Sequence, residues 1–398
     1  MKTQALVIGA GPAGCAAALT LRRAGVEVIL ADRSDFPRDK VCGDALIPDS
    51  LAALERLGLK DSAAAAGRQC HTLHIHAPDG TRVALRSEFV CLPRRSFDSL
   101  LQQAAVSAGA AFLPLSRALG PLMNGDTVAG ARFRPAGGGS DLAVRAEMTL
   151  LATGAAPAAL ADFGVCLRHR ASALAVRAYY RVPDDFAQEM DHLCISYGRA
   201  VRPGYGWIFP GPDNVFNVGV GVFQDGGRRS PAANPRLLWP AFTRGFLPAR
   251  RIVEEGERIG PLQGAPLRTG LSGARLHRPG LLVIGEAAGL TYSFSGEGIG
   301  KAMESGILAG EILARHLAGT AGDPAEAGPQ YERTLRARYG ERFRAYRIAQ
   351  DWLYWPSVCN LVARRANSDA RVRRLLEGML TETTEPRAIL SVAGLLSL

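Results

Sequence analysis

The chain has 398 residues, of which 47% are hydrophobic and 21% are charged, and its formal net charge is +10. This composition is typical of a globular protein with one large domain or two closely joined domains, and no apolar run reaches the roughly 18 residues of a membrane span. The seven cysteines are scattered and contain no Cys-x-x-Cys pair. We therefore expect a reducing, cytoplasmic environment with no disulfide framework and no metal site.

The N-terminal residues alternate between strand, glycine-rich turn, helix and strand. The apolar run Ala5–Ile8 predicts a strand, and the motif Gly9-Ala10-Gly11-Pro12-Ala13-Gly14 follows it directly. A helix of small residues is expected from Cys15 to about Ala24, and a second apolar strand over Val26–Ala31 ends at Asp32. This order is typical of the βαβ unit that binds dinucleotides.

Each glycine of this motif has a place in dinucleotide binding. Gly9 allows the tight turn, Gly11 lets a pyrophosphate approach the backbone, and Gly14 lets the helix pack closely on the sheet. The free N–H groups and the positive dipole of the helix start face the phosphates, and Asp32 is placed to accept a ribose hydroxyl. The motif predicts a dinucleotide site and leaves FAD and NAD(P) as alternatives.

Three further segments of the N-terminal half are expected next to this site. A polar loop over 33–40 leads into Val41-Cys42-Gly43-Asp44, where the cysteine is either a small buried residue at a tight turn or a functional group. The pair Arg94-Arg95 precedes an amphipathic helix with Ser96 as its expected N-cap, and such arginines can hold an anionic cofactor. A buried strand ends in Thr153-Gly154, which lets the backbone approach a nucleotide.

Residues 70–92 predict two strands joined by the turn Pro78-Asp79-Gly80. The first strand carries His71, His74 and His76. Because no further ligand completes a metal set nearby, we expect these histidines at surface or half-buried strand positions.

Between residues 168 and 260 helical periodicity gives way to strand-like alternation. Leu174–Arg181 and Val215–Val222 alternate in this way, and Gly204-Tyr205-Gly206-Trp207-Ile208-Phe209-Pro210 lies between them. We expect an antiparallel sheet inserted into the nucleotide domain. Its aromatic residues either wall a substrate pocket or form plain sheet core.

A second strand, acid, glycine-rich turn and helix follow far downstream. The apolar run Leu281–Gly285 is followed by Glu286, and a turn through Gly296 and Gly298 leads at Ile299 into a helix that reaches about His316. An ordinary NAD(P) domain does not need this element, whereas a two-part FAD site does. The first motif would take the ADP half, and the second would take the ribityl chain and stabilise negative charge on the reduced flavin.

The chain beyond Pro324 is expected to be helical and basic. Residues 331–374 hold eleven arginines and four acidic residues. An anionic membrane surface, nucleic acid and a solvated helix face are the alternatives for such a stretch, and nucleic acid is the least expected partner.

With both nucleotide motifs placed, the chain resembles the flavoproteins that include aromatic hydroxylases, flavin-dependent halogenases and geranylgeranyl reductases, and most of all the geranylgeranyl reductase family. The resemblance covers nearly the whole length and rests on Gly9–Gly14, Lys40–Gly43, Arg94–Asp98, Ala152–Gly154, Gly204–Pro210, Gly285–Gly298 and the basic helical tail. It implies bound FAD and an external reductant, which is NAD(P)H, ferredoxin or another donor. It also implies reduction of carbon–carbon double bonds in an isoprenoid-like or other apolar substrate.

Two departures from these families bear on the activity. The acid after the downstream strand is usually Asp, but here it is Glu286, which is one methylene longer. Halogenases carry Gly-Trp-x-Trp-x-Ile-Pro where this chain has Gly204–Pro210, and they need a lysine directed into a tunnel, for which Lys40 and Lys301 are the candidates. A flavin monooxygenase or halogenase of the same fold, and a non-catalytic flavin-binding or membrane-binding protein, remain alternatives.

These patterns define the expected architecture and site. The fold class is α/β: a Rossmann-like FAD-binding domain (1–165 with 261–320), an inserted β-sheet substrate domain (166–260, with contributions from about 70–95) and a C-terminal helical region (321–398). The resemblance implies catalytic roles for Cys42 and Asp44 near the flavin, and it implies that Tyr205, Trp207 and Phe209 line the substrate cavity. The expected cofactor contacts are Gly9, Gly11, Pro12, Ala13, Gly14, Asp32, Arg33, Lys40, Cys42, Gly43, Arg94, Gly154, Gly285, Glu286, Gly296, Gly298 and Ile299.

Overall fold

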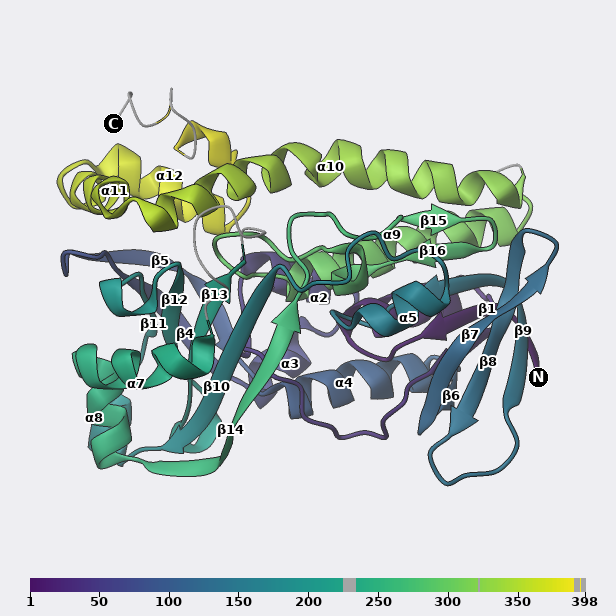
Figure 1. Cartoon of the computed structure of the whole chain (residues 1–398), viewed down its shortest axis with the longest axis horizontal. Coiled ribbons are helices and arrows are strands. Elements are labelled where there is room, and N and C mark those ends of the chain that lie inside the picture. The colour runs from purple at the N-terminus through teal and green to yellow at the C-terminus, as the bar shows by residue number, and fades with distance from the viewer. Residues whose placement is uncertain (225–233, 321–322, 390–393, 395–398) are drawn as a thin grey trace.

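The computed structural model describes residues 1–224, 234–320, 323–389 and 394 of the chain. These residues form two β-sheets and a layer of helices that extends across both of them (Figure 1). The α/β class expected from the sequence is confirmed. Among the described residues, no helix is both long enough and apolar enough to cross a membrane.

The first sheet is parallel around the N-terminal motif. Its strand order is β15-β16-β9-β1-β2-β6, with β8 added to β9 and β7 to β8. The strands are β1 (Lys2–Ile8), β2 (Val28–Ala31), β6 (Ala111–Leu113), β7 (Ser116–Asn124), β8 (Thr127–Pro135), β9 (Leu142–Leu151), β15 (His277–Arg278) and β16 (Leu281–Val283). β1 pairs in parallel with β2 and β9, and all four residues of β2 are buried, as expected for parallel strands covered on both faces.

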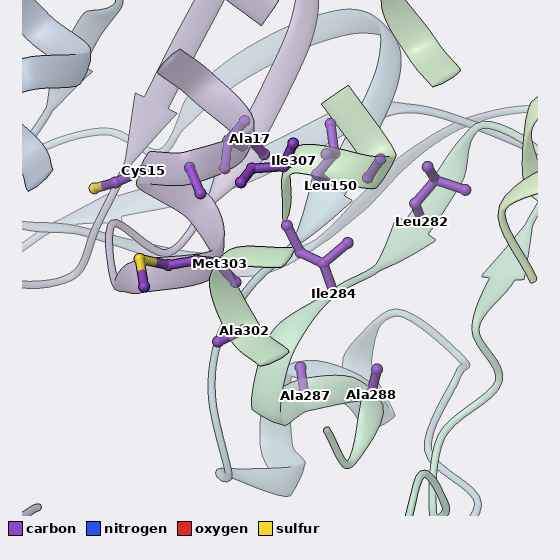
Figure 2. Close-up of a cluster of buried hydrophobic side chains, with 14 of the residues drawn as sticks. Cys15, Ala17, Leu150, Leu282, Ile284, Ala287, Ala288, Ala302, Met303 and Ile307 are labelled. Atoms are coloured by element: carbon purple, nitrogen blue, oxygen red, sulfur yellow. The ribbon is translucent and has the colours of Figure 1, made fainter. Parts of the chain in front are cut away.

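Two helices made of small residues lie against this sheet and against each other. They are α1 (Pro12–Arg23) and α9 (Ile299–Leu317), which starts after the short helix η3 (Gly285–Ala288). Figure 2 shows side chains from both helices and from β9 and β16 gathered in one apolar cluster, among them Cys15, Ala17, Leu150, Leu282, Ala302, Met303 and Ile307. The two nucleotide motifs, far apart in the sequence, are therefore parts of a single packed unit.

The helix after the expected arginine pair, α4 (Arg94–Ser107), begins earlier than the sequence analysis predicted. Its N-cap is Pro93, and Ser96 lies inside the first turn, so the N-cap prediction is wrong. The carboxylate of Asp44, from a distant part of the chain, accepts from the backbone N–H of Arg94 at 3.2 Å. A carboxylate from another part of the chain, and not a local serine, thus accepts from a backbone N–H group in the first turn of α4.

The second sheet takes strands from three parts of the chain. Its order is β14-β10-β13-β12-β11-β4-β5-β3, antiparallel except that β4 pairs in parallel with β11. The strands are β3 (Ala45–Leu46), β4 (Arg68–His76), β5 (Arg82–Cys91), β10 (Ala173–Arg181), β11 (Leu193–Ser196), β12 (Gly204–Pro210), β13 (Val215–Phe223) and β14 (Glu257–Leu267). The expected boundary at residue 260 therefore falls inside β14.

Short helices fill the connections between the strands of both sheets. They are α2 (Pro48–Arg56), α3 (Lys60–Ala66), α5 (Pro157–Asp162), α6 (Asp184–Glu189), α7 (Pro235–Gly245) and α8 (Leu247–Glu255). Phe216, Val218 and Val220 on one face of β13 form a core with Phe242 of α7 and Ile252 of α8. The opposite face of β12 and β13 is left to line a cavity.

The C-terminal helices join the two sheets. α10 (Ala327–Gln350) runs along α9 and continues over the second sheet, where α11 (Pro356–Ser368) and α12 (Ala370–Leu380) lie (Figure 1). The buried Tyr331 donates from its hydroxyl to the carbonyl of Val283 at 3.2 Å, and Ala366 packs near Val83 of β5. Residues 390–393 and 395–398 of the expected helical tail lie outside the described residues.

Candidate active site

A single cavity of about 970 Å³ lies between the two sheets and receives residues from both nucleotide motifs. One end, which we call the α1 end, is lined by Gly11, Asp32 and Arg38. The opposite, α9 end is lined by Gly296 and Gly298, with β12 beside them. The carboxyl ends of parallel strands are where open α/β sheets bind nucleotides, and β1, β2 and β9 end here.

At the α1 end, the glycines differ in what surrounds them. A Cβ on Gly14 would collide with the carbonyl oxygen of Gly9, whereas a Cβ on Gly11 would meet only Arg38 Nη2, at 3.7 Å. Gly11 therefore leaves space above the start of α1. Asp32 is held beside this space, since its carboxylate accepts from the backbone N–H groups of Ala10 at 2.7 Å and of Ser34 at 2.9 Å.

Two arginines share one buried carboxylate in the wall of the cavity. Arg94 donates to both oxygens of Asp98, at 2.7 and 2.9 Å, and Arg38 Nη1 lies 2.9 Å from Asp98 Oδ2. Because one negative charge faces two guanidinium groups, a net positive charge remains near the start of α1. Guanidinium groups and a helix N-terminus together suit a phosphate ligand.

The Cys-Gly segment and the aromatic strand, predicted separately, meet in the middle of the cavity. A Cβ on Gly43 would come within 2.9 Å of the ring of Phe209. Asn217 of β13 joins these parts, because its amide N–H₂ donates to Cys42 O and Asp44 Oδ2, each at 2.7 Å. Its carbonyl oxygen accepts from Trp207 Nε1 at 2.9 Å.

Asp44 is the most constrained residue of this segment. It has φ +68, which is unusual for a residue other than glycine, and it is 3% exposed. Its carboxylate accepts from Tyr179 at 2.5 Å as well as from Asn217 and the N–H of Arg94. Burial raises the pKa of Asp44 to about 6, while the hydrogen bonds from Tyr179 and Asn217 act in the opposite direction. Asp44 thus holds neighbouring elements in place.

At the α9 end, the turn before the helix contacts β12. Tyr205 donates from its hydroxyl to the carbonyl of Ser295 at 2.5 Å. A Cβ on Gly154 would lie 3.7 Å from Glu286 Oε2, so this acid faces the end of β9. Thr153 also lines the cavity. Its buried Oγ1 has no hydrogen-bond partner among the described residues, so this hydroxyl is available to a ligand.

An apolar arm extends the cavity beneath the second sheet. Its lining side chains come from β4, β5, β11, β12 and α12, and they are Leu73, Phe89, Leu193, Ile195, Phe209 and Leu380. None of these six side chains is charged, and the ring centroid of Phe209 lies 6.5 Å from that of Trp207. The arm fits an extended apolar ligand better than a polar one.

Comparison with known proteins identifies the family. Residues 2–179 match the FAD binding domain family. A menaquinone reductase of Mycolicibacterium smegmatis is 30% identical over 380 residues, which cover 87% of this chain and 84% of the relative. A digeranylgeranylglycerophospholipid reductase of Methanosarcina mazei is also 30% identical, over 81% of this chain and 77% of the relative. The chain belongs to the geranylgeranyl reductase family of FAD-dependent oxidoreductases. The family, the enzyme class and FAD, all expected from the sequence, are confirmed.

Solved structures share the fold of this family member at lower identity. A geranylgeranyl bacteriochlorophyll reductase-like protein of Thermoplasma acidophilum has a TM-score of 0.76 at 22% identity, over 100% of this chain and 95% of that one. A flavin-dependent brominase has a TM-score of 0.77 at 21% identity, over 99% and 98%. These likenesses concern the architecture of the chain and not its reaction.

The cavity of this family member fits FAD. Its α1 end offers an open helix start, a net positive charge and a fixed carboxylate for the ADP half. Its α9 end offers a second helix start and the hydroxyl of Thr153, which has no hydrogen-bond partner in the described part of the chain. Within the described residues, no group of histidine, cysteine and acidic side chains could hold a metal ion.

The cavity brings together most of the expected site residues. Those that line it are Gly9, Gly11, Pro12, Ala13, Asp32, Arg33, Lys40, Cys42, Gly43, Asp44, Arg94, Gly154, Tyr205, Trp207, Phe209, Glu286, Gly296, Gly298 and Ile299. Gly14 and Gly285 are not among its lining residues. A Cβ on Gly285 would lie 2.6 Å from Ala13 Cβ, so both glycines permit close packing behind the cavity wall.

Sequence reasoning gave no role to Arg38 or Asn217, and it named Asp98 only within the matching stretch Arg94–Asp98. The pairing of Arg38 with Asp98 gives no local signal, because the loop and the helix that carry them meet only in the folded chain. Asn217 does give one: it is the single amide in the apolar strand Val-Phe-Asn-Val-Gly-Val-Gly-Val-Phe. Lys301, one of the two lysines considered for a halogenase, does not line the cavity and is bound by carboxylates.

Proposed function

We propose that this enzyme reduces carbon–carbon double bonds in the prenyl chain of a lipid. The observation that supports this proposal is the apolar arm of the cavity, whose walls are aliphatic and aromatic side chains. Digeranylgeranylglycerophospholipid and menaquinone, the molecules in the relatives' names, both contain isoprene units with isolated double bonds. A chain of such units matches an elongated apolar arm.

In this proposal the protein binds, orients and shields the prenyl chain. Bound FAD supplies a hydride when it is reduced. The fixed indole of Trp207 and the phenol of Tyr205 form the wall where the arm meets the α9 end, so they would set which double bond approaches the cofactor. The aliphatic side chains exclude water from that position.

The proposal is tested with the FAD-loaded protein reduced anaerobically by dithionite and mixed with a geranylgeranylated glycerophospholipid. We expect oxidation of the flavin and a product that gains two hydrogens for each reduced bond, detected by mass spectrometry. A parallel sample receives oxygen and halide. A hydroxylated or halogenated product there, with no hydrogenated lipid in the anaerobic sample, would favour the monooxygenase or halogenase alternative. A protein that shows no flavin absorption after incubation with FAD and removal of the free cofactor would favour a non-catalytic role.

We further propose that an external donor reduces the flavin and that the basic C-terminal helices contact an anionic membrane in which the lipid dissolves. NADH, NADPH and reduced ferredoxin are to be compared by the rate at which each bleaches the flavin under anaerobic conditions. Bleaching by NADPH or NADH alone would favour a nicotinamide donor, and bleaching by ferredoxin alone would favour a protein donor.

A further inference from the structure

A lysine and three carboxylates form a buried cluster behind the α9 end of the cavity. Lys301 Nζ lies 2.5 Å from Glu304 Oε2 and 2.8 Å from Glu382 Oε2. The third carboxylate oxygen, Asp49 Oδ2, is 3.4 Å away. Tyr292 donates to the other oxygen of Glu382 at 2.9 Å. Lys301 is 1% exposed, so α2, α9 and the segment after α12 meet at one ammonium group out of contact with water.

Asp49 connects this cluster to the cavity. It lies in the first turn of α2, is buried and lines the cavity. A Cβ on Gly300 would collide with the Asp49 carboxyl group, so the glycine lets this carboxyl lie against the first turn of α9. The positive end of a helix stabilises negative charge there.

Glu297 lies on the cavity side of the same cluster. It precedes α9 by two residues and lines the cavity between Gly296 and Gly298, in the turn expected to contact the flavin. Charged and titratable groups face it from every neighbouring element: Asp49 of α2, Lys301 of α9, Glu382 after α12, Tyr197 after β11, Tyr205 of β12 and Tyr346 of α10.

The cluster holds more acid than base. Three carboxylates pair with one lysine and the charge of Glu297 acts on the same groups, so full ionisation of the four acids would leave a large uncompensated negative charge around the buried Lys301. Burial, followed by the charges of Asp49 and Glu382, raises the pKa of Glu297 to about 8, and Lys301 acts in the opposite direction. Glu297 is therefore mainly a neutral carboxylic acid at pH 7.

We propose that Glu297 donates the proton that completes the reduction of the substrate double bond, and that the Lys301 cluster returns a proton to it from solvent. This role rests on the proposed function. One carbon of the double bond accepts the hydride that reduced FAD supplies. The electron pair of the breaking π bond takes the proton of Glu297 and forms the second C–H bond. The double bond gains two electrons, and Glu297 is left as a carboxylate.

The cluster has a route to solvent. The side chains of Glu304 and Glu382 are 15% and 22% exposed, whereas Lys301 and Asp49 between them and the cavity are almost completely buried. A proton taken up at these partly exposed carboxylates can pass to Lys301 and Asp49, which form ion pairs with each other, and Asp49 is the charge that acts most strongly on Glu297. Asp44, in comparison, has both carboxylate oxygens occupied by donors, and its surroundings hold it in place.

The test uses the FAD-loaded protein and the variant E297Q, which keeps the shape of the side chain but cannot donate a proton. Without substrate, infrared spectroscopy of the wild type should show a protonated carboxyl band that disappears as the pH rises through about 8. E297Q should lack this band. The control E311Q removes an exposed carboxylate of α9 that pairs with Arg56, and this variant should keep the infrared band. The band reports on Glu297 whatever the substrate is.

With the prenyl lipid, E297Q should reduce the double bond about a hundredfold more slowly than the wild type, and E297D should restore part of the rate. The wild-type rate should fall as the pH rises through about 8, and the E297Q rate should not. If the E297Q variant is as fast as an active wild type, or if the wild type lacks the titrating band, the role of Glu297 is overturned and the proposed function is not. A wild type that shows the band but reduces no prenyl chain overturns the proposed function, and this role with it.

Discussion

Two glycines of the first motif, only three residues apart, have different physical roles. A methyl group on Gly14 would run into the carbonyl oxygen of Gly9, whereas one on Gly11 would project into the cavity and contact only Arg38. Gly11 has φ −80, a value that alanine adopts without strain. We therefore predict that G11A folds with a melting temperature close to that of the wild type but binds FAD at least tenfold more weakly.

The matched variant G14A should lose stability and FAD together, because its methyl group meets backbone that cannot move aside. Thermal unfolding of the FAD-free proteins and flavin fluorescence titration separate the two effects. A G11A protein that binds FAD as tightly as the wild type would contradict the expected approach of a phosphate at this residue.

Asn217 is a second residue whose role follows from its contacts. It holds Trp207, Cys42 and Asp44 through one amide group and is 2% exposed. N217A leaves three buried polar groups without this partner, so we predict a loss of about 2 kcal/mol in the free energy of unfolding. Urea unfolding at pH 7 measures the loss. N124A, which changes an exposed asparagine at the end of β7, should cost less than 0.5 kcal/mol.

Sequence patterns predicted the helices and strands that depend on local motifs or on periodic apolar residues. β1, α1 and α9 follow directly from apolar runs, glycine-rich turns and small residues, and the alternation in β13 marked the face that packs under α7. The parallel pairing of β4 with β11 had no such signal, because the two strands are distant in the chain and each could have paired elsewhere. The apolar arm depends on that pairing, so its lining could not be derived from the sequence.

The histidines of β4 behave as the sequence analysis expected, as strand residues. His76 packs edge-on against Phe246, and the ring of His74 lies 3.8 Å from that of His192. Burial is the largest cause that lowers the pKa of both His74 and His76 to about 4. The pKa of a histidine in the unfolded chain is about 6.5, so between pH 6.5 and pH 4 the unfolded chain binds more protons at these two residues than the folded chain does. Their contribution to the free energy of unfolding therefore falls as the pH falls from 6.5 to 4.

We predict that the double variant H74Q/H76Q loses less stability than the wild type between pH 7 and pH 4.5, as measured by the urea midpoint. The raised pKa values of Asp44 and Asp49 act in the opposite direction, but they are present in both proteins and cancel in the comparison. H71Q, which changes an exposed histidine of the same strand, is the control and should follow the wild type. Parallel pH curves for H74Q/H76Q and wild type would refute the explanation.

For the whole molecule, α10 is the element that unites cofactor domain, second sheet and surface. Its inner face is anchored by the buried Tyr331 and Phe343, and its outer face carries the exposed Arg344 and Arg347. Around the junction of α10 and α11, large apolar side chains are also exposed: Ile348 at 48%, Trp355 at 58% and Leu361 at 42%. Exposed apolar groups among arginines suit the interface of an anionic bilayer.

This surface and the apolar arm would serve one purpose, because a prenyl lipid has to leave the bilayer to reach the cavity. We predict that the protein floats with vesicles rich in phosphatidylglycerol at low salt and is released at about 0.5 M salt, where charges are screened. Each surface arginine contributes about 1 kcal/mol to such binding, so R344Q/R347Q should bind about thirtyfold more weakly. The control R181Q/R250Q, which removes two exposed arginines from β10 and α8, should bind like the wild type. Equal binding by both double variants, or absence of flotation at low salt, would show that the basic helices are a solvated face.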